Sequence, residues 1–328
     1  MPATILPSVQ QILNRYIMST SFTMGLLGNL CCSIVFFKNS NPRTACSIYF
    51  FALSISTNVY LLWSVPLIFY TLDHVDPQTK SLVYCKMRIY ISHVLGLYTR
   101  YLIVLACIDV FFLTRSNVRI RLWSSTKIAY LLTATVCVAC PTVASHFPIF
   151  MDLRGSTCGL FDSYRYFFGI YQLVLVSLLP SVLMGIFGIL AVRTIHQRGT
   201  ALTSVRRRDR DLMRMIVAEI LINIIASIPL SANLIYTAAT ISLMNKSAER
   251  IEIDAFMNFL GQFINQGIFI APFYLFILSS KSFRHDFQQI VNTFWFKYIR
   301  RQNRVTQINA RPVTFTKHHE TGFPKTTI

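Results

Sequence analysis

Three charged side chains lie within, or at the end of, long apolar stretches of the sequence. Arg100 and Glu219 lie inside such stretches, and Asp109 ends one, directly before Val110 and a basic segment. A charge at membrane depth is costly unless it is paired or hydrated, so each of these groups needs a partner. The sequence contains no phosphate-binding loop, metal-ligand cluster or catalytic constellation. We therefore expect neither an enzyme nor a cofactor.

The elements that carry these charges are long apolar segments. Of the 328 residues, 53% are hydrophobic and 13% are charged, about half the charged fraction of a typical soluble domain. A run of roughly 20 apolar residues is long enough to cross a bilayer. We therefore predict an all-α membrane protein, a seven-transmembrane helix bundle whose helices lie at about 17–37, 46–72, 86–114, 126–150, 166–192, 213–243 and 253–278.

The distribution of basic residues predicts the orientation of the chain. Most lysines and arginines fall in alternate segments, at 38–45, 115–127, 193–214 and 279–328. By the positive-inside rule these segments are cytoplasmic. The net charge of +18 then reflects this asymmetry and attraction to anionic membrane lipid, with no need for nucleic acid. We expect a multi-pass plasma-membrane protein with its N-terminus outside and its C-terminus inside.

The same reasoning divides the chain into three parts. We predict an extracellular N-terminus at 1–16, a seven-transmembrane domain with a short amphipathic eighth helix at 17–290, and a largely disordered cytoplasmic tail at 291–328. No cleavable signal peptide is evident, so the first helix is expected to act as signal and anchor. Cys85 and Cys158 both fall on the oxidising side, which favours a disulfide between them.

Several landmarks together resemble the rhodopsin-like (class A) G-protein-coupled receptors, over about residues 20–290. They are Gly28-Asn29, Cys85 with Cys158, Asp109 at the end of the third helix, the deep prolines Pro180, Pro229 and Pro272, and the Phe283-Arg284 segment. The segments RRRDRDLMRMI and SSKSFRHDF are most similar to invertebrate peptide receptors, including FMRFamide-receptor-like ones.

The chain departs from this family at its switch positions. Asp109-Val110-Phe111 takes the place of Asp-Arg-Tyr, so the arginine that pairs with an acid on helix 6 is missing, although Asp209 occupies the acid's place. Helix 6 lacks the family's tryptophan. Thr57 or Asn58 replaces the helix-2 aspartate, and Leu275 or Phe276 replaces the helix-7 tyrosine. The predicted coupling and switch residues are Asp109, Val110, Phe111, Arg206, Arg207, Arg208, Asp209, Pro229, Pro272 and Tyr274.

The resemblance also places Arg100 and Glu219 at nearby depths facing the bundle interior. We predict that they form an ion pair joining helices 3 and 6; the alternative is separate solvation by Asn223, serines or water. Ser92 stands where aminergic receptors carry an aspartate, and Asn265 where opsins carry a lysine. Neither an amine nor retinal is therefore expected as ligand.

The resemblance implies a ligand cavity in the outer half of the bundle. The predicted cavity residues are Ser92, His93, Tyr98, Tyr171, Gln172, Asn233, Tyr236, Asn258 and Gln262. Such a mixture suits an amidated or uncharged peptide end, or a small neutral molecule. Asn245-Lys246-Ser247 is a potential glycosylation site. The terminal Thr326-Thr327-Ile328 fits capture by a PDZ domain, and threonines in the tail could recruit arrestin once phosphorylated.

These features predict a cell-surface receptor, for a peptide, that activates a heterotrimeric G protein through outward movement of helix 6. The alternative is an atypical receptor, scavenging or arrestin-biased, that lost coupling because Val110 replaces the arginine. A transporter or channel would need a path of buried ionisable residues or repeated halves with broken helices, and the sequence shows neither.

Overall fold

The computed structural model describes residues 5–38, 44–115, 117–155, 157–161, 163–197, 204–240 and 247–309. Within these ranges, side chains are described except at 195–197, 204–209, 238 and 298–309. The chain divides into two compact units, Met1–Asp286 and Phe287–Ile328. The first unit holds the bundle and every site considered below.

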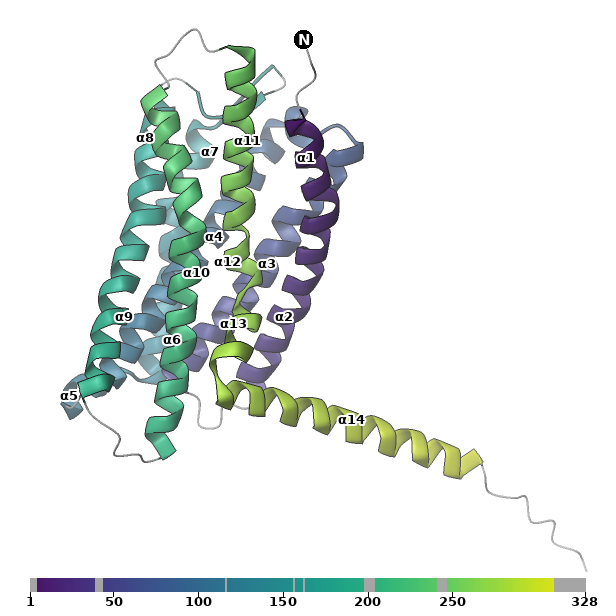
Figure 1. Ribbon diagram of the computed structural model, residues 1–328, viewed down its shortest axis with the longest axis vertical. Helices are drawn as coiled ribbons and strands as arrows, with labels where there is room; N and C mark the ends of the chain where they lie inside the picture. The colour runs from purple at the N-terminus through teal and green to yellow at the C-terminus, as the bar shows by residue number, and fades with distance from the viewer. Residues whose placement is uncertain are drawn as a thin grey trace, which may run out of the picture. The chain divides into compact units, whose positions relative to one another are not determined.

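Within the described residues, the chain folds as an all-α bundle of seven membrane-spanning helices. Six spans are long and apolar enough by themselves, and the seventh is a bent pair. Figure 1 shows them running side by side. In chain order they are α1–η1–α2 (Leu6–Ile12, Leu13–Met18, Ser19–Lys38), α3 (Ala45–Asp73), α4 (Leu82–Leu113), α6–α7 (Thr126–Val143, His146–Phe150), α8–η3–α9 (Tyr164–Tyr171, Gln172–Leu178, Leu179–Gln197), α10 (Ser204–Thr240) and α11–α12–α13 (Ala248–Asn265, Gly267–Ile270, Pro272–Ser279).

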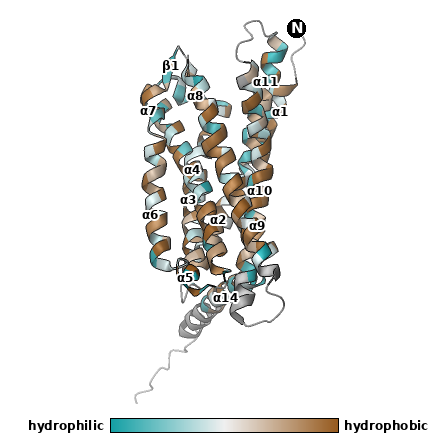
Figure 2. Ribbon diagram, turned by 90° about the vertical axis from the view of Figure 1, so that its left-hand side faces the viewer, coloured by the Kyte–Doolittle hydropathy of each residue, from teal (hydrophilic) through white to brown (hydrophobic). Residues whose placement is uncertain are grey.

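Elements outside the seven spans mark the two ends of the bundle. At one end, β1 (Asp152–Arg154) pairs antiparallel with β2 (Thr157–Gly159), and η2 (Pro77–Thr79) precedes α4. We call this the hairpin end. At the other end, α5 (Val118–Arg121) follows α4, and α14 (Lys281–Asn309) follows α13. We call this the α5 end. Figure 2 shows hydrophobic residues predominating along the helices and hydrophilic residues near the β1 hairpin.

Polar side chains begin several of these helices. Thr44, Ser81, Ser125 and Ser247 each accept a hydrogen bond from the backbone N–H three residues later. Such caps satisfy one of the N–H groups that a helix leaves without an internal partner. They fix where α3, α4, α6 and α11 start, and hence which residues each span exposes at its two ends.

The seventh span is broken near its middle. Its two parts, Ala248–Ile270 and Pro272–Ser279, are bent by 54° relative to one another. Pro272 has no backbone N–H, so it interrupts the helical hydrogen-bond ladder at the bend. The predicted deep proline Pro229, in contrast, lies inside the continuous helix α10, as Pro66 does in α3, and Pro180 lies at the start of α9. The single-turn π segments η1 and η3 interrupt the first and fifth spans.

The first and seventh spans approach each other closely at Gly28. A Cβ atom at that position would lie 2.9 Å from Cβ of Phe273. Next to it, the buried Asn29 donates from Nδ2 to the carbonyl oxygen of Phe269 over 2.8 Å. A small residue beside a polar one is the arrangement that lets membrane helices pack closely and bond across the interface. The packing expected from Gly28-Asn29 is therefore present.

The helices extend beyond two of the predicted boundaries. The helix of the first span begins at Leu6, so the predicted N-terminal segment 1–16 is helical from that residue, and its extracellular location stays a prediction. The eighth helix is present as α14, but it continues to Asn309 and is neither short nor followed by a disordered segment from residue 291. Hydropathy predicted both limits from where apolar residues thin out, and a helix can continue beyond that point. Residues 310–328 lie outside the described part of the chain.

Candidate ligand site and coupling site

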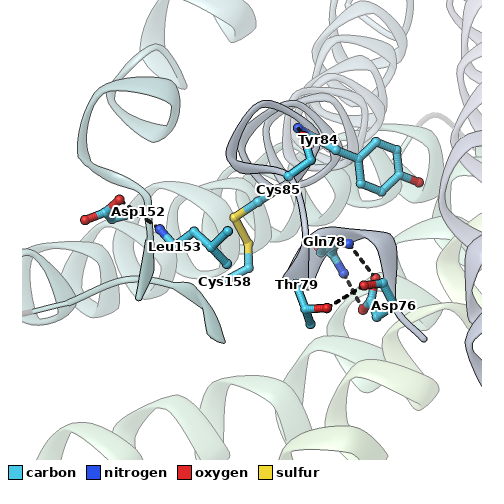
Figure 3. The surroundings of a disulfide bond; sticks show 9 residues. Asp76, Gln78, Thr79, Tyr84, Cys85, Asp152, Leu153 and Cys158 are labelled. Atoms are coloured by element: carbon cyan, nitrogen blue, oxygen red, sulfur yellow. Dashed lines mark hydrogen bonds between the residues drawn. A yellow bond between two sulfur atoms is a disulfide. The ribbon is translucent and has the colours of Figure 1, made fainter. Parts of the chain in front are cut away.

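A disulfide fastens the hairpin to the third span. Cys85, in the first turn of α4, is bonded to Cys158 on β2, with their Cα atoms 5.9 Å apart. Figure 3 shows this bond beside the η2 turn, where the Asp76 carboxylate accepts hydrogen bonds from the backbone and side-chain amides of Gln78. Cys85 is fully buried. The disulfide predicted from the sequence is present, and it ties the loop after α7 to the start of α4.

One group of predicted ligand residues connects the second, third and fifth spans. The Ser92 hydroxyl lies 2.9 Å from that of Ser64 on α3. His93 Nε2 lies 2.9 Å from the hydroxyl of Tyr171 on α8, and its ring packs 4.4 Å from that of Phe147. These contacts make a polar and aromatic group, which we call the α4 group.

A second group connects the sixth and seventh spans. Asn233 on α10 donates from Nδ2 to Oδ1 of Asn258 on α11 over 3.2 Å, and Gln262 donates to the same oxygen over 3.4 Å. Nearer the hairpin end, Arg250 donates from Nε to the Tyr236 hydroxyl over 3.1 Å. We call these residues the α10–α11 group. It holds four of the nine predicted ligand residues.

Two predicted ligand residues belong to neither group. Tyr98 packs against the buried cluster that includes Leu97 and Cys140, so it contributes to the contact with the fourth span. The buried Oε1 of Gln172, in the π segment η3, has no hydrogen-bond partner among the described residues. Among the described residues, no hydrogen bond joins the α4 group to the α10–α11 group. The two groups are therefore separate hydrogen-bonded clusters.

The predicted Arg100–Glu219 ion pair is wrong in this structure. Arg100 is 6% exposed and donates from Nη2 to Oδ1 of Asn265 on α11 over 2.7 Å. Glu219 is fully buried, and neither carboxylate oxygen has a hydrogen-bond partner among the described residues. A neutral amide on the seventh span thus takes the role expected of the acid. Sequence spacing gave the depth of each residue but not which neighbouring helix it faces.

At the α5 end, Asp109 and Val110 of the switch triplet are buried, and Phe111 is half-buried. Val110 is 1% exposed and Asp109 is 5% exposed, and Asp109 Oδ2 has no hydrogen-bond partner in the described chain. Phe111 packs against Phe187 on α9, with ring centroids 5.4 Å apart. The guanidinium of Arg115 lies 4.2 Å from the centroid of the Phe111 ring.

A different acid, Asp211, makes the interhelical contact at this end. It is 4% exposed, and its Oδ2 accepts hydrogen bonds from the backbone N–H of Ser282 over 3.0 Å and from the Ser282 hydroxyl over 2.6 Å. Sequence reasoning missed both residues because it followed the family's position to Asp209. The side chains of Arg206, Arg207, Arg208 and Asp209 lie outside the described part. The sequence did offer a signal for this contact, because Asp211 follows the basic run at 206–210 and Ser282 directly precedes Phe283.

The remaining switch residues lie at helix contacts. Tyr274 donates its hydroxyl hydrogen to the carbonyl oxygen of Met24 over 3.1 Å, which joins α13 to α2. Gly261 lies so close to α10 that an added Cβ would be 3.4 Å from the carbonyl carbon of Pro229. Asn245, Thr326 and Ile328 lie outside the described residues, so the expected glycosylation and PDZ motifs have no structural account.

Comparison with known proteins gives one limited similarity. No family model matches the chain. Over 76 residues, 23% of this chain, it is 34% identical to the protein named neuromedin U receptor homolog nmur-2 of Caenorhabditis elegans. The match covers 19% of that protein, so the chain spans about a fifth of the length of the relative it matches. The similarity supports a receptor-like membrane protein and reaches no further.

Proposed function

We propose that this chain is a plasma-membrane receptor that transmits the binding of an extracellular peptide to a heterotrimeric G protein. The observation that carries the proposal is the seven-helix bundle whose third span is joined by the Cys85–Cys158 disulfide to a hairpin at one end. The partial similarity to a neuromedin U receptor homolog favours a peptide ligand. The excess of basic residues at the other end favours a cytoplasmic α5 end and an extracellular hairpin end.

The proposed ligand site lies between the α4 group and the α10–α11 group. Apart from the guanidinium of Arg250 in the α10–α11 group, both groups consist of neutral hydroxyl, amide and imidazole side chains with aromatic neighbours. An amidated or uncharged peptide end has the donors and acceptors to bond both groups at once. A ligand that bonds both favours whichever bundle conformation holds them at the matching separation. Because α10, the sixth span, carries part of the α10–α11 group, agonist binding would act directly on that span.

Val110 favours a second candidate function. Its side chain is apolar and 1% exposed, so it offers neither the charge nor the reach of the arginine that the family uses. An atypical receptor that binds ligand without activating a G protein, as a scavenger or through arrestin alone, is consistent with this replacement. A PDZ protein at the C-terminus and anionic lipid beside the basic segments are proposed as further partners.

The test compares wild type with Val110→Arg. Cells expressing each at equal surface level are given a neuropeptide library, and G-protein activation and arrestin recruitment are measured together. Val110→Leu, which keeps the position apolar, is the matched control. Activation of a G protein by wild type supports the proposed function. Signalling by Val110→Arg alone, or arrestin recruitment without G-protein activation in wild type, would replace it with the atypical receptor.

A further inference from the structure

The contact between Asp211 and Ser282 joins the sixth span to the element that follows the seventh. Asp211 is the second residue of α10 with a described side chain, and Ser282 lies in the first turn of α14. One carboxylate oxygen accepts two hydrogen bonds from Ser282, at 3.0 Å and 2.6 Å. A carboxylate that accepts bonds from both the backbone and the side chain of one residue holds that residue in a single place.

The first turn of α14 needs such an acceptor. The first four N–H groups of a helix have no partner within it, and they favour a negative charge nearby. Ser280 caps one of them, accepting from the N–H of Phe283 over 3.1 Å. Asp211, from another helix, serves the N–H of Ser282. The bond to the carboxylate is charge-assisted and therefore stronger than a neutral one.

The surroundings of Asp211 make this bond its main interaction. Arg214, one turn further along α10, lies 3.6 Å from the other carboxylate oxygen, but its side chain is 50% exposed. A hollow beside the contact is lined by apolar residues, among them Val35, Leu212, Met215 and Phe283, and by the polar residues Thr44, Ser47, Ser280 and Asp286. Asp211 is 4% exposed, so its carboxylate has little access to water. Outward displacement of this end of α10 would break both hydrogen bonds.

Val110 leaves the closed bundle without the arginine that could tie the third span to an acid on the sixth. The hydrogen bonds of Asp211 instead join the same end of α10 to α14. We propose that the Asp211–Ser282 contact is a latch that holds the α5 end of α10, the sixth span, against α14 in the resting receptor. Activation opens this latch. This inference rests on the proposed function for its purpose, although the latch itself is a property of the bundle.

The experiment measures the latch without requiring any signalling partner. Full-length protein in lipid nanodiscs, free of ligand, is compared with Asp211→Asn and Ser282→Ala by hydrogen exchange at residues 210–216 and 280–284. Ser279→Ala is the matched control, because the Ser279 hydroxyl bonds only to the Leu275 carbonyl of its own helix. Basal nucleotide exchange on purified heterotrimeric G proteins is measured on the same samples.

For a latch, each variant is expected to raise exchange in both segments, by roughly tenfold for loss of one charge-assisted bond, while Ser279→Ala changes neither. Faster exchange at 280–284 alone would reduce Asp211 to a cap for α14 and overturn the proposal, as would no change in either segment. Faster exchange in both segments without nucleotide exchange on any G protein would keep the latch and reject the proposed G-protein coupling.

A disulfide trap supplies an independent check. In the Asp211→Cys/Ser282→Cys double variant, oxidation should close the latch covalently and lower hydrogen exchange at 210–216 below that of the reduced variant, and a reducing agent should reverse this. Exchange at 210–216 that is as fast with the crosslink in place as without it would show that this end of α10 opens without parting from α14, which also overturns the proposal.

Discussion

The two charges inside the bundle are accommodated in different ways. Arg100 keeps its charge beside a neutral amide, that of Asn265, at a separation of 2.7 Å. Glu219 is buried without any donor to either oxygen in the described chain. A desolvated carboxylate without a partner is expensive and is relieved by taking up a proton. The bundle interior thus holds one cation, Arg100, bonded to a neutral amide, and one acid, Glu219, without a hydrogen-bond partner in the described chain.

Replacing Glu219 by glutamine should therefore stabilise the bundle. The amide has a similar shape, is neutral without taking up a proton, and supplies N–H donors one turn from Asn223, whose buried Oδ1 also lacks a partner among the described residues. We expect Glu219→Gln to raise the free energy of unfolding by about 1–3 kcal/mol, measured as a higher melting temperature in detergent. Glu249→Gln, at an exposed position of α11, should leave it unchanged. A lower melting temperature for Glu219→Gln would mean that the carboxylate has a stabilising partner.

Among the helices, the limits of the spans follow from hydropathy, but their interruptions do not. The predicted run 46–72 corresponds to α3, at Ala45–Asp73, and the run 86–114 to α4, at Leu82–Leu113. The thickness of the bilayer sets these lengths, so each span appears in the sequence as a run of apolar residues long enough to cross it. The π segment Gln172–Leu178 and the 54° bend near Ala271 depend on how neighbouring helices pack, which apolar residue counts do not record.

The approach of the first and seventh spans makes glycine necessary at position 28. An added Cβ would lie 2.9 Å from Cβ of Phe273, an atom fixed to the backbone of α13. We expect Gly28→Ala to destabilise the protein by about 1–3 kcal/mol through overpacking, measured by thermal unfolding in detergent. Gly185→Ala is the control, because no atom lies within 4 Å of an added Cβ there. Equal melting temperatures for the two variants would contradict this close approach.

At the scale of the whole molecule, the disulfide fixes the hairpin over one end of the bundle. It links residues 73 positions apart, from the start of α4 to β2. Closing a loop of that length restricts the unfolded chain and typically stabilises a protein by about 2–4 kcal/mol. The double replacement Cys85→Ser/Cys158→Ser should lower the unfolding free energy by that amount and speed proteolysis of the hairpin. Cys137→Ser, at an exposed free cysteine, is the control. If proteolysis of the hairpin is equally fast in both variants and in wild type, the disulfide does not hold the hairpin in place.

The candidate sites were only partly predictable. Helical geometry gives the depth and face of a residue, and the structure brings the predicted ligand residues Ser92, His93 and Tyr171 into one group; that they bind a ligand stays a prediction. The separation of the nine predicted ligand residues into different groups, and the hydrogen bond of Arg100 to Asn265, depend on the rotation of each helix against its neighbours. Asp211 was missed because the family's arginine is absent here, so the family's acid was not a reliable guide to the acid that makes the contact.

The bend in the seventh span has a consequence for how such a chain can change over generations. The part before the bend carries Asn258, Gln262 and Asn265, and the part after it carries Tyr274 and leads to Ser282. Since Pro272 interrupts the ladder between them, a substitution that turns one part need not turn the other. Changes in packing around Asn258 and Asn265 can then leave the contacts of Tyr274 and Ser282 unaltered, so the two parts of the span can vary separately.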